Sequence, residues 1–479
     1  MRLLGLTDWR SGRTVDLVLP QAVESALIDE TGAMSAEVDR MDASGLVLAP
    51  ALVDPHVHLR DPGQTDKEDM VTGTAAAAAG GYGLILLMPN TRPAMDGRAR
   101  MADGRTVIDY LESYERDHGL HLPVDYALCV AATMDRAGRQ ASNPDDWSGH
   151  LPGQGWAHPV VAISDDGSAV TDRTLEAVAA NARSVDLPIL DHCEHHECGQ
   201  VNLGAVSRQL GLEGIPASTE TAIIHRDIEL AERTGTRVHL QHVSTAGGFE
   251  AVRRAKARGL PVTCETAPHY LALCDEDLLR CGSMAKMNPP LRSRADQQAA
   301  LEAVADGTVD MIATDHAPHT AAEKALGLKD APNGIIGLET AYAVCNQVLV
   351  KSGLIGHDRL IELMSLAPAE LMGMRRLLPE DLPSHMAKKV NKADTGHLQL
   401  EVDQHSEAGQ PPVDLVILDP EAKWEVDPSR FHSKARNTPF AGAELAGRVM
   451  ATIKAGRLVF SRLPASRVST RERIRAWTD

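Results

Sequence analysis

From about residue 52 to residue 363, short apolar runs alternate with longer amphipathic stretches. Apolar runs of about four to eight residues predict buried strands, and most of the intervening stretches are long enough for a helix. Helices are expected, among other places, at 173–183, 218–234 and 245–258. The predicted strands are Leu52–Val57, Leu84–Met88, Val124–Val130, Val160–Ser164, Pro188–His192, Arg237–His242, Pro261–Glu265 and Val309–Thr314.

Eight strands joined by helical crossovers favour an α/β fold, a TIM-like (β/α)8 barrel, over residues 51–375. In such a barrel the functional residues lie at the carboxyl ends of the strands. A doubly wound open sheet fits the same alternation, because periodicity does not show whether a sheet closes.

The two flanks of the barrel region have a different pattern. Residues 1–50 and 412–462 contain short β-rich runs without helical stretches between them, and we expect both segments to pair into one small β domain. The polar stretch 376–411 predicts a surface excursion, and residues 463–479 predict a C-terminal tail. The β-rich runs are Thr14–Leu19, Val413–Leu418, Arg448–Ile453 and Leu458–Phe460.

Composition and charge narrow the classes of partner. Of the 479 residues, 43% are apolar and 24% are charged, which is typical of a globular chain. The net charge of -18 disfavours nucleic acid as a partner, and the few aromatic residues leave little material for a base-stacking surface. An anionic small-molecule substrate would need a local cation near the catalytic groups.

Cysteine usage and hydropathy indicate a cytoplasmic protein. The seven cysteines form no CxxC pair, which argues against a disulfide framework and against a thiolate zinc site. The N-terminal residues become polar before a signal-like apolar stretch develops. The longest apolar stretch, Thr74–Met88, is too short to cross a bilayer, so we expect no membrane partner.

Ligand-type side chains recur at the ends of the predicted strands. His56 and His58 share one face of the first strand, where two imidazoles can bind one divalent ion. An HxH pair alone is a weak signal, since such histidines are more often ordinary polar or packed residues. His192, His242 and Asp315 end three further strands, and a barrel would bring all five side chains together. The sequence therefore predicts a metal centre.

Eight motifs extend this pattern across most of the chain, from about Leu46 to Gly456. They are HVHLRDPGQTDKED, MPNTRPAMD, ISDDG, HCE, HVST, KMNPPLR, IATDHAPH and SKARNTPF. Together they closely resemble the motifs of dihydroorotases, in the amidohydrolase superfamily. The resemblance implies a small β domain built from both termini and a centre of one or two zinc ions. It also implies the reversible cyclisation of N-carbamoyl-L-aspartate to L-dihydroorotate in pyrimidine (UMP) biosynthesis, a homo-oligomer, and aspartate carbamoyltransferase as a candidate partner.

The resemblance assigns roles to individual residues. His56 and His58 are similar to the ligands of a first metal, and His192 and His242 to those of a second. Asp315 is similar to the metal-binding carboxylate that also serves as general base and acid. The residues similar to the substrate-binding set are Arg60, Asn90, Asn288, His319, Asn333 and Gly334.

The group that bridges the two metals is expected to be a carboxylate. Many relatives use a carbamylated lysine on a middle strand, but this chain has no lysine between Lys67 and Lys256. The ISDDG motif offers two aspartates instead, and resemblance to the lysine-less type I class of dihydroorotases singles out Asp166 as a metal ligand. Asp165 is expected to be structural.

Alternatives remain for several residues and for the function. Asn90 and Asn288 lie beside prolines and can cap turns, and Arg60 can form a structural ion pair with Asp54 or Asp61. The chain can also be another cyclic-amide hydrolase, such as a hydantoinase, dihydropyrimidinase or allantoinase. Arg60 and the missing lysine argue against that assignment. A silent paralogue that scaffolds aspartate carbamoyltransferase would have lost ligands, and none is lost.

Overall fold

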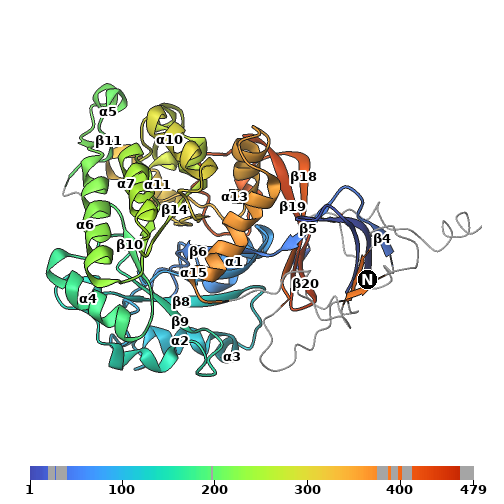
Figure 1. Ribbon diagram of the computed structural model, residues 1–479, viewed down its shortest axis with the longest axis horizontal. Helices are drawn as coiled ribbons and strands as arrows, with labels where there is room; N and C mark the ends of the chain where they lie inside the picture. The colour runs from blue at the N-terminus through green and yellow to red at the C-terminus, as the bar shows by residue number, and fades with distance from the viewer. Residues whose placement is uncertain are drawn as a thin grey trace, which may run out of the picture.

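A computed structural model describes residues 1–19, 27–28, 40–195, 198–374, 387–389, 398–401 and 413–463. It contains a helix-covered eight-stranded sheet and, beside it along the longest axis of the molecule, a separate sheet of ten strands (Figure 1). The predicted C-terminal tail beyond residue 463 lies outside the described residues.

The eight strands of the first sheet are parallel and follow one another in chain order. Val57 forms a parallel bridge with His316, and the backbone N–H of His58 donates to the His316 carbonyl at 3.0 Å, so the two ends of the sheet meet. This closure and the sequential order confirm the TIM-like barrel and exclude the doubly wound alternative. The strands are β6 (Leu52–Val57), β7 (Tyr82–Leu87), β8 (Asp125–Ala131), β9 (Val160–Ser164), β10 (Ile189–His192), β13 (Val238–Gln241), β14 (Val262–Thr266) and β15 (Met311–Ile312).

Apolar residues occupy both faces of these strands because the barrel has an interior and a helix-covered exterior. In β7 every residue is buried, and alternate side chains join two different apolar clusters. Ile85 and Leu87 belong to one cluster, and Leu84 and Leu86 to the other. The strands therefore appear in the sequence as continuous apolar runs.

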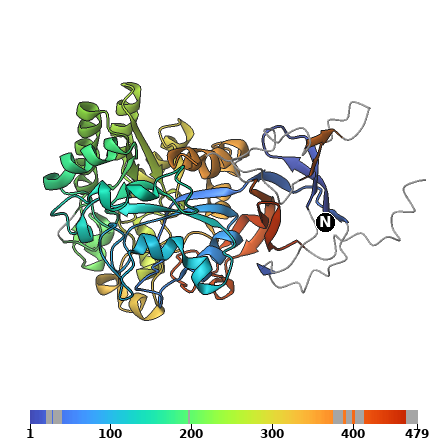
Figure 2. The ribbon, with the colours of Figure 1, turned by 90° about the horizontal axis from the view of Figure 1, so that it is seen from below.

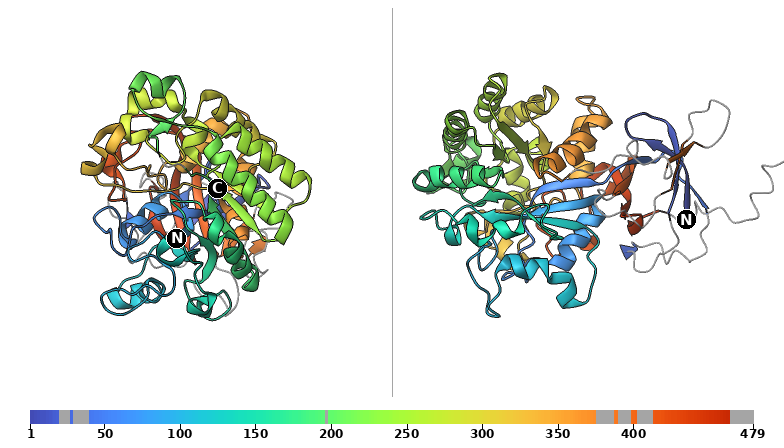
Figure 3. Two further views of the ribbon diagram at one scale, coloured as in Figure 1. Left: turned by 90° about the vertical axis from the view of Figure 1, so that its left-hand side faces the viewer. Right: turned by 60° about the horizontal axis from the view of Figure 1, so that its bottom comes forward.

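Helices surround the barrel, as seen with the bottom of the molecule brought forward (Figure 3). The longer ones are α1 (Met70–Ala79), α4 (Asp172–Ser184), α6 (Ser218–Thr234), α7 (Ala246–Ala257) and α10 (Arg294–Ala305). Shorter helices are α2 (Val107–Glu112), α3 (Tyr114–His118), α5 (Ala205–Leu210), α8 (Pro268–Ala272), α9 (Leu278–Cys281), α11 (Ala321–Lys324), α12 (Gly327–Asp330), α13 (Ala341–Cys345), α14 (His357–Ile361) and α15 (Ala367–Leu371). The crossover from β8 to β9 differs, since it contains only short 3-10 turns.

The amphipathic pattern of α4 shows why these segments are helices that cover the barrel. Leu175, Val178, Ala179 and Ala182 are buried and fall on one helical face at i, i+3, i+4 and i+7. Among the described residues, no helix is long and apolar enough to cross a membrane.

The second sheet combines both ends of the chain, as the view from below shows (Figure 2). β5 pairs with β18 in antiparallel register, with Ala49 opposite Val416, and Leu3, Leu17 and Ile453 lie in the shared core. The expected small β domain from both termini is confirmed, while its residue limits stay a prediction. Its strands are β1 (Arg2–Asp8), β2 (Thr14–Val18), β3 (Leu27–Ile28), β4 (Arg40–Asp42), β5 (Val47–Pro50), β16 (Ala387–Lys389), β17 (Leu398–Glu401), β18 (Leu415–Glu425), β19 (Glu444–Lys454) and β20 (Arg457–Ser461).

Two of these strands, β16 and β17, come from the stretch 376–411 that the sequence predicts as a surface excursion. β17 runs parallel to β2, and its Leu400 is only 2% exposed, so this part of the stretch belongs to the sheet. The remainder of the stretch lies outside the described residues.

Candidate metal centre and substrate pocket

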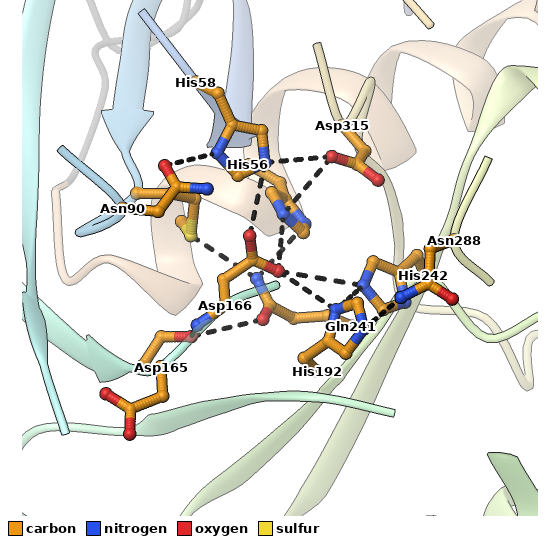
Figure 4. Close-up of polar contacts among 12 residues, drawn as sticks. His56, His58, Asn90, Asp165, Asp166, His192, Gln241, His242, Asn288 and Asp315 are labelled. Atoms are coloured by element: carbon orange, nitrogen blue, oxygen red, sulfur yellow. Dashed lines mark hydrogen bonds and ion pairs between the residues drawn. The ribbon is translucent and has the colours of Figure 1, made fainter. Parts of the chain in front are cut away.

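Six side chains predicted as metal ligands meet at the carboxyl ends of the barrel strands (Figure 4). All six are buried. Their convergence follows from the closed barrel, because the carboxyl ends of parallel strands share one rim. The six are His56 and His58 at the end of β6, Asp166 after β9, His192 at the end of β10, His242 after β13 and Asp315 after β15.

The carboxylate of Asp166 lies between two pairs of imidazoles. Its Oδ1 is 3.2 Å from His56 Nε2 and 3.3 Å from His192 Nδ1, and its Oδ2 is 3.2 Å from His58 Nε2. The Nε2 atom of His242 lies 3.8 Å from Asp166 Oδ1 and 2.8 Å from His192 Nδ1. Asp166 thus contacts both pairs, which is the position a bridging ligand requires.

Asp315 reaches the same centre from the end of β15, the strand that meets β6 where the barrel closes. Its Oδ1 lies 3.1 Å from His58 Nε2 and 3.6 Å from His56 Nε2. It therefore borders the first histidine pair and also the open pocket, which it helps to line.

The donor set fits divalent metal ions. Three overlapping groups of these side chains have ligand atoms within 4.8 Å of one another. Ligands bound to one tetrahedral zinc at about 2.0–2.1 Å lie roughly 3.3 Å apart, close to the separations observed here. The donors are imidazole nitrogens and carboxylate oxygens without a thiolate, a combination that zinc accepts. His56 Nε2 is buried and has no hydrogen-bond partner among the described residues.

The electrostatics favour ionised carboxylates and, at His58 and His192, neutral imidazoles. Burial opposes charge on Asp166 and Asp315, but His56 and His58 outweigh it and hold the pKa of both carboxyls below the usual range. Burial also lowers the pKa of His58 and of His192, so their lone pairs are available. The carboxylates, His58 and His192 are therefore in the protonation state that metal binding requires, whereas Asp166, Asp315 and Glu265 raise the pKa of His56 well above its usual value.

Hydrogen bonds behind the histidines orient the rings. His56 Nδ1 lies 2.7 Å from Glu265 Oε1 and His58 Nδ1 lies 2.9 Å from Asn90 Oδ1. Because these oxygens accept, each ring carries a proton on Nδ1 and directs its Nε2 at the centre.

Glu265 on β14 is a site residue that the sequence reasoning missed. Its other oxygen lies 3.0 Å from His239 Nε2, and contacts with His56 and His239 overcome burial and lower its pKa to about 2. The available signal was a glutamate in an otherwise apolar, buried strand, since a buried charge needs a partner.

Asp165 points away from the centre (Figure 4). Its carboxylate accepts hydrogen bonds from the backbone N–H of Thr133, at 3.0 Å, and from the Thr133 hydroxyl. The guanidinium of Arg136 donates to the carbonyls of Asp165 and Asp166. These contacts hold the turn that presents Asp166, in keeping with a structural role for Asp165.

Three of the candidate site residues have left-handed backbone conformations. The φ angles are 62° at Arg60, 38° at His242 and 47° at Asp315. Each costs about 1–2 kcal/mol relative to ordinary conformations. Such strain persists only where the surrounding structure determines it, and it concentrates here at the strand ends that carry the chemistry.

A cavity of about 390 Å³ opens beside the metal centre. It is bordered by His58, Asp166, His192 and Asp315. All six residues predicted to bind substrate line it as well, namely Arg60, Asn90, Asn288, His319, Asn333 and Gly334.

The structural alternative for Arg60 is not observed. Asp54 accepts instead from Thr314, and Asp61 accepts from Tyr110. Among the described residues the Arg60 guanidinium has no hydrogen-bonded or ion-paired partner, and its Nε is buried. Burial lowers its pKa to about 10, so it remains a cation at neutral pH.

The two asparagines contact the metal-centre histidines. Asn90 accepts from His58, and Asn288 Nδ2 lies 3.0 Å from His192 Nε2. The Oδ1 of Asn288 is buried and has no hydrogen-bond partner in the described part of the chain. Both side chains thus face the pocket rather than the turns beside them.

Comparison with known proteins identifies the family of the chain. Residues 47–377 match the amidohydrolase family. The chain is 38% identical over 455 residues to a dihydroorotase from Geobacter metallireducens, covering 94% of this chain and 96% of the relative. It is 41% identical over 438 residues to a dihydroorotase from Anaeromyxobacter dehalogenans, covering 89% of each. The chain belongs to the dihydroorotases, within the amidohydrolase family.

Solved structures with the same fold include proteins of lower sequence identity. An L-hydantoinase (dihydropyrimidinase) from Arthrobacter aurescens is 24% identical with a TM-score of 0.69, covering 96% of both chains. A dihydropyrimidinase from Brevibacillus agri is 19% identical with a TM-score of 0.71, covering 97% of this chain and 95% of that one. At these identities the likeness shows that this dihydroorotase family member shares their fold, and nothing more.

The contact between His56 and Glu265 leads to a first prediction. Glu265→Gln should weaken binding of a divalent metal about 10- to 100-fold, because the amide no longer supplies a charged acceptor to the ligand ring. Competition with a chelator of known affinity measures the loss. The matched control is Glu302→Gln on exposed α10, which should bind metal as the parent does. Equal metal affinity in Glu265→Gln would mean that Glu265 does not support the centre.

Proposed function

We propose that the protein is a zinc-dependent dihydroorotase, which interconverts N-carbamoyl-L-aspartate and L-dihydroorotate in pyrimidine biosynthesis. The observation that carries the proposal is the partly buried cation of Arg60, which has no partner among the described residues and lines a pocket bordered by the histidine–aspartate centre. A substrate with a carboxylate beside a cyclic amide uses both parts of this pocket. The direct experiment is an assay of the purified protein with dihydroorotate, followed by metal analysis.

The proposed metal centre holds one or two zinc ions. His56 and His58 would hold a first ion and His192 and His242 a second, and Asp166, which contacts both pairs, would be available to each. When bound, such an ion lowers the pKa of water and polarises a carbonyl, and an unactivated amide needs both effects.

Asp315 is the proposed general base and acid. Its carboxyl is ionised, borders the pocket and lies beside His58, so it can accept a proton from the attacking water. In the same turnover it returns the proton to the departing ring nitrogen. One carboxylate therefore serves both directions of the reversible reaction.

The proposed substrate contacts start from two pocket side chains that have polar atoms without a hydrogen-bond partner among the described residues. Arg60 offers its guanidinium to the carboxylate of dihydroorotate, a bidentate pairing that a planar fork favours. Asn288 offers a buried oxygen without a partner in the described structure, which suits a ring N–H. Asn90, His319, Asn333 and Gly334 complete the pocket wall.

The alternative activities fit the site less well. Hydantoinases and dihydropyrimidinases share the fold, but their substrates lack the carboxylate that Arg60 would bind. A carbamylated lysine also cannot form on strands β7 to β10, since that part of the chain contains no lysine. A silent scaffold would not retain six converging ligands.

Location and assembly are part of the same proposal. All seven cysteines lie within the described residues and none of them forms a disulfide there, which supports a reducing, cytoplasmic location. A homo-oligomer and a complex with aspartate carbamoyltransferase stay predictions, which light scattering with and without the second enzyme would test.

Asp166, rather than a carbamylated lysine, is predicted to complete the centre. Asp166→Ala should lower metal occupancy by about one ion in a two-metal centre, because one carboxylate contacts both histidine pairs. Metal analysis checks the occupancy, and Asp172→Ala on the exposed start of α4 is the control. Bicarbonate-dependent activation, or a carbamate in the intact mass, would contradict the prediction.

Asp315→Asn should retain the fold and most of the metal but lose turnover by about 100- to 10,000-fold. The amide can still ligate through oxygen, whereas it cannot carry the proton. Steady-state rates in both directions, compared with metal content, separate the two effects. Turnover near that of the parent would mean that Asp315 is not the general base.

Arg60→Met should lower kcat/KM for dihydroorotate by about 30- to 5,000-fold, equivalent to about 2–5 kcal/mol for the loss of a buried charged partner. Metal content should stay normal, and Arg139→Met, on an exposed turn, should behave as the parent. Dihydrouracil, which lacks the carboxylate, should be a poor substrate both for the parent protein and for the Arg60→Met variant. If the parent protein prefers dihydrouracil or hydantoin, the dihydroorotase assignment is wrong.

A further inference from the structure

One wall of the substrate pocket is an irregular segment, 331–334, whose four consecutive carbonyls all accept side-chain hydrogen bonds. Ala331 O accepts from Lys286 Nζ at 2.7 Å. The next three carbonyls accept from Lys324, from His319 and again from Lys324, at 3.0, 2.8 and 3.0 Å. A segment without helix or strand is thereby held by donors from outside itself.

Lys324 is the central donor of this arrangement. It ends the short helix α11, is only 1% exposed, and donates to the carbonyls of Pro332 and Gly334 on either side of Asn333. Burial and the neighbouring cation of Lys286 lower its pKa to about 7. Burying a lysine amino group is costly, and the two carbonyl acceptors offset part of that cost.

Close packing on the opposite side leaves the segment little freedom. Gly334 has a φ of 152°, and a Cβ atom there would lie 2.5 Å from Ala317 O and 2.7 Å from His319 Cδ2. Asn437 joins the two ends of the loop, because its Nδ2 donates to the carbonyls of Ala317 and Gly334, at 3.0 Å each. Its Oδ1 accepts from the backbone N–H of His319 at 3.1 Å.

The ring of His319 belongs to the same framework. Because the Asn333 carbonyl can only accept, His319 carries its proton on Nε2, and Nδ1 lies 3.4 Å from Lys67 Nζ. Burial and the cations of Arg60 and Lys67 lower the pKa of His319 to about 3, so the ring is neutral. The tautomer of a pocket residue is thus set by the backbone that Lys324 holds.

We propose that Lys324 is a positioning residue for substrate binding, which fixes the wall Pro332–Gly334 and, through Asn333, the ring of His319. The residue does not itself line the pocket and acts through the loop backbone. The proposal rests on the proposed function for the identity of the substrate, dihydroorotate, but not for the structural effect on the loop. It also accounts for Asn437 of the SKARNTPF motif, which holds the same loop from the other side.

The kinetic test compares Lys324→Met with Lys329→Met. Lys329 lies on the same loop, and its exposed side chain makes the second variant a matched control. Lys324→Met should raise KM for dihydroorotate and lower kcat/KM by about 100-fold, as small displacements of positioning groups do, with kcat changed much less and metal content unchanged. The control should match the parent. An unchanged KM in folded Lys324→Met would overturn the proposal, as would an equal fall of kcat with unchanged KM.

A second measurement does not depend on activity. Hydrogen exchange of peptides covering residues 325–336, without substrate, should be faster in Lys324→Met than in the parent and unchanged in Lys329→Met. Lys324→Gln, which keeps a shorter donor, should give intermediate exchange and intermediate KM, and it replaces Lys324→Met if that variant does not fold. Equal protection of these peptides from exchange in all variants would mean that Lys324 does not hold the loop. Absence of dihydroorotate turnover in the parent would reject the proposed function alone, since the exchange result still decides the role of Lys324.

Discussion

The structure depends on the burial of one ionised carboxylate, Asp166, among four imidazoles. An isolated buried carboxylate is very costly, and its charge is tolerated here because His56, His58 and His192 lie within 3.3 Å. The partners come from the ends of β6 and β10 and Asp166 itself follows β9, so the charge is compensated only when these three strands keep their relative positions. Closure of the barrel through Val57 and His316 supplies that constraint.

The surroundings of the centre show the same dependence on the closed barrel. Left-handed conformations at Arg60, His242 and Asp315 are unfavourable locally and are stabilised by the strands that precede them. Glu265 adds a further buried charge, which His56 and His239 compensate. Rigid strands thus carry the metal-binding groups, whereas the substrate wall at 331–334 is irregular and obtains its rigidity from side chains.

That difference explains what the sequence could predict. Strand ends such as His56 and His192 follow from apolar periodicity, and in a parallel barrel strand ends converge, so the fold and the meeting of the histidines could be derived before the structure. Periodicity carries no information on which distant groups meet. Glu265 lies 209 residues from His56 and Asn437 lies 103 residues from Gly334, so neither contact leaves a spacing pattern. The β17 strand was missed for a related reason, because a short run in a polar stretch gives little signal until β2 is beside it.

Substrate choice within this fold must come from single side chains rather than from architecture. Hydantoinase and dihydropyrimidinase structures superpose on this chain with TM-scores of 0.69 and 0.71, so the fold alone does not separate a neutral cyclic amide from an anionic one. The chain carries a net charge of -18, which repels an anion at long range. At short range the pocket presents Arg60, which has no partner among the described residues, with Lys67 next to the pocket residue His319. Because screening weakens the distant charges more than a close contact, we expect the local cation to outweigh the net charge when an anionic substrate binds.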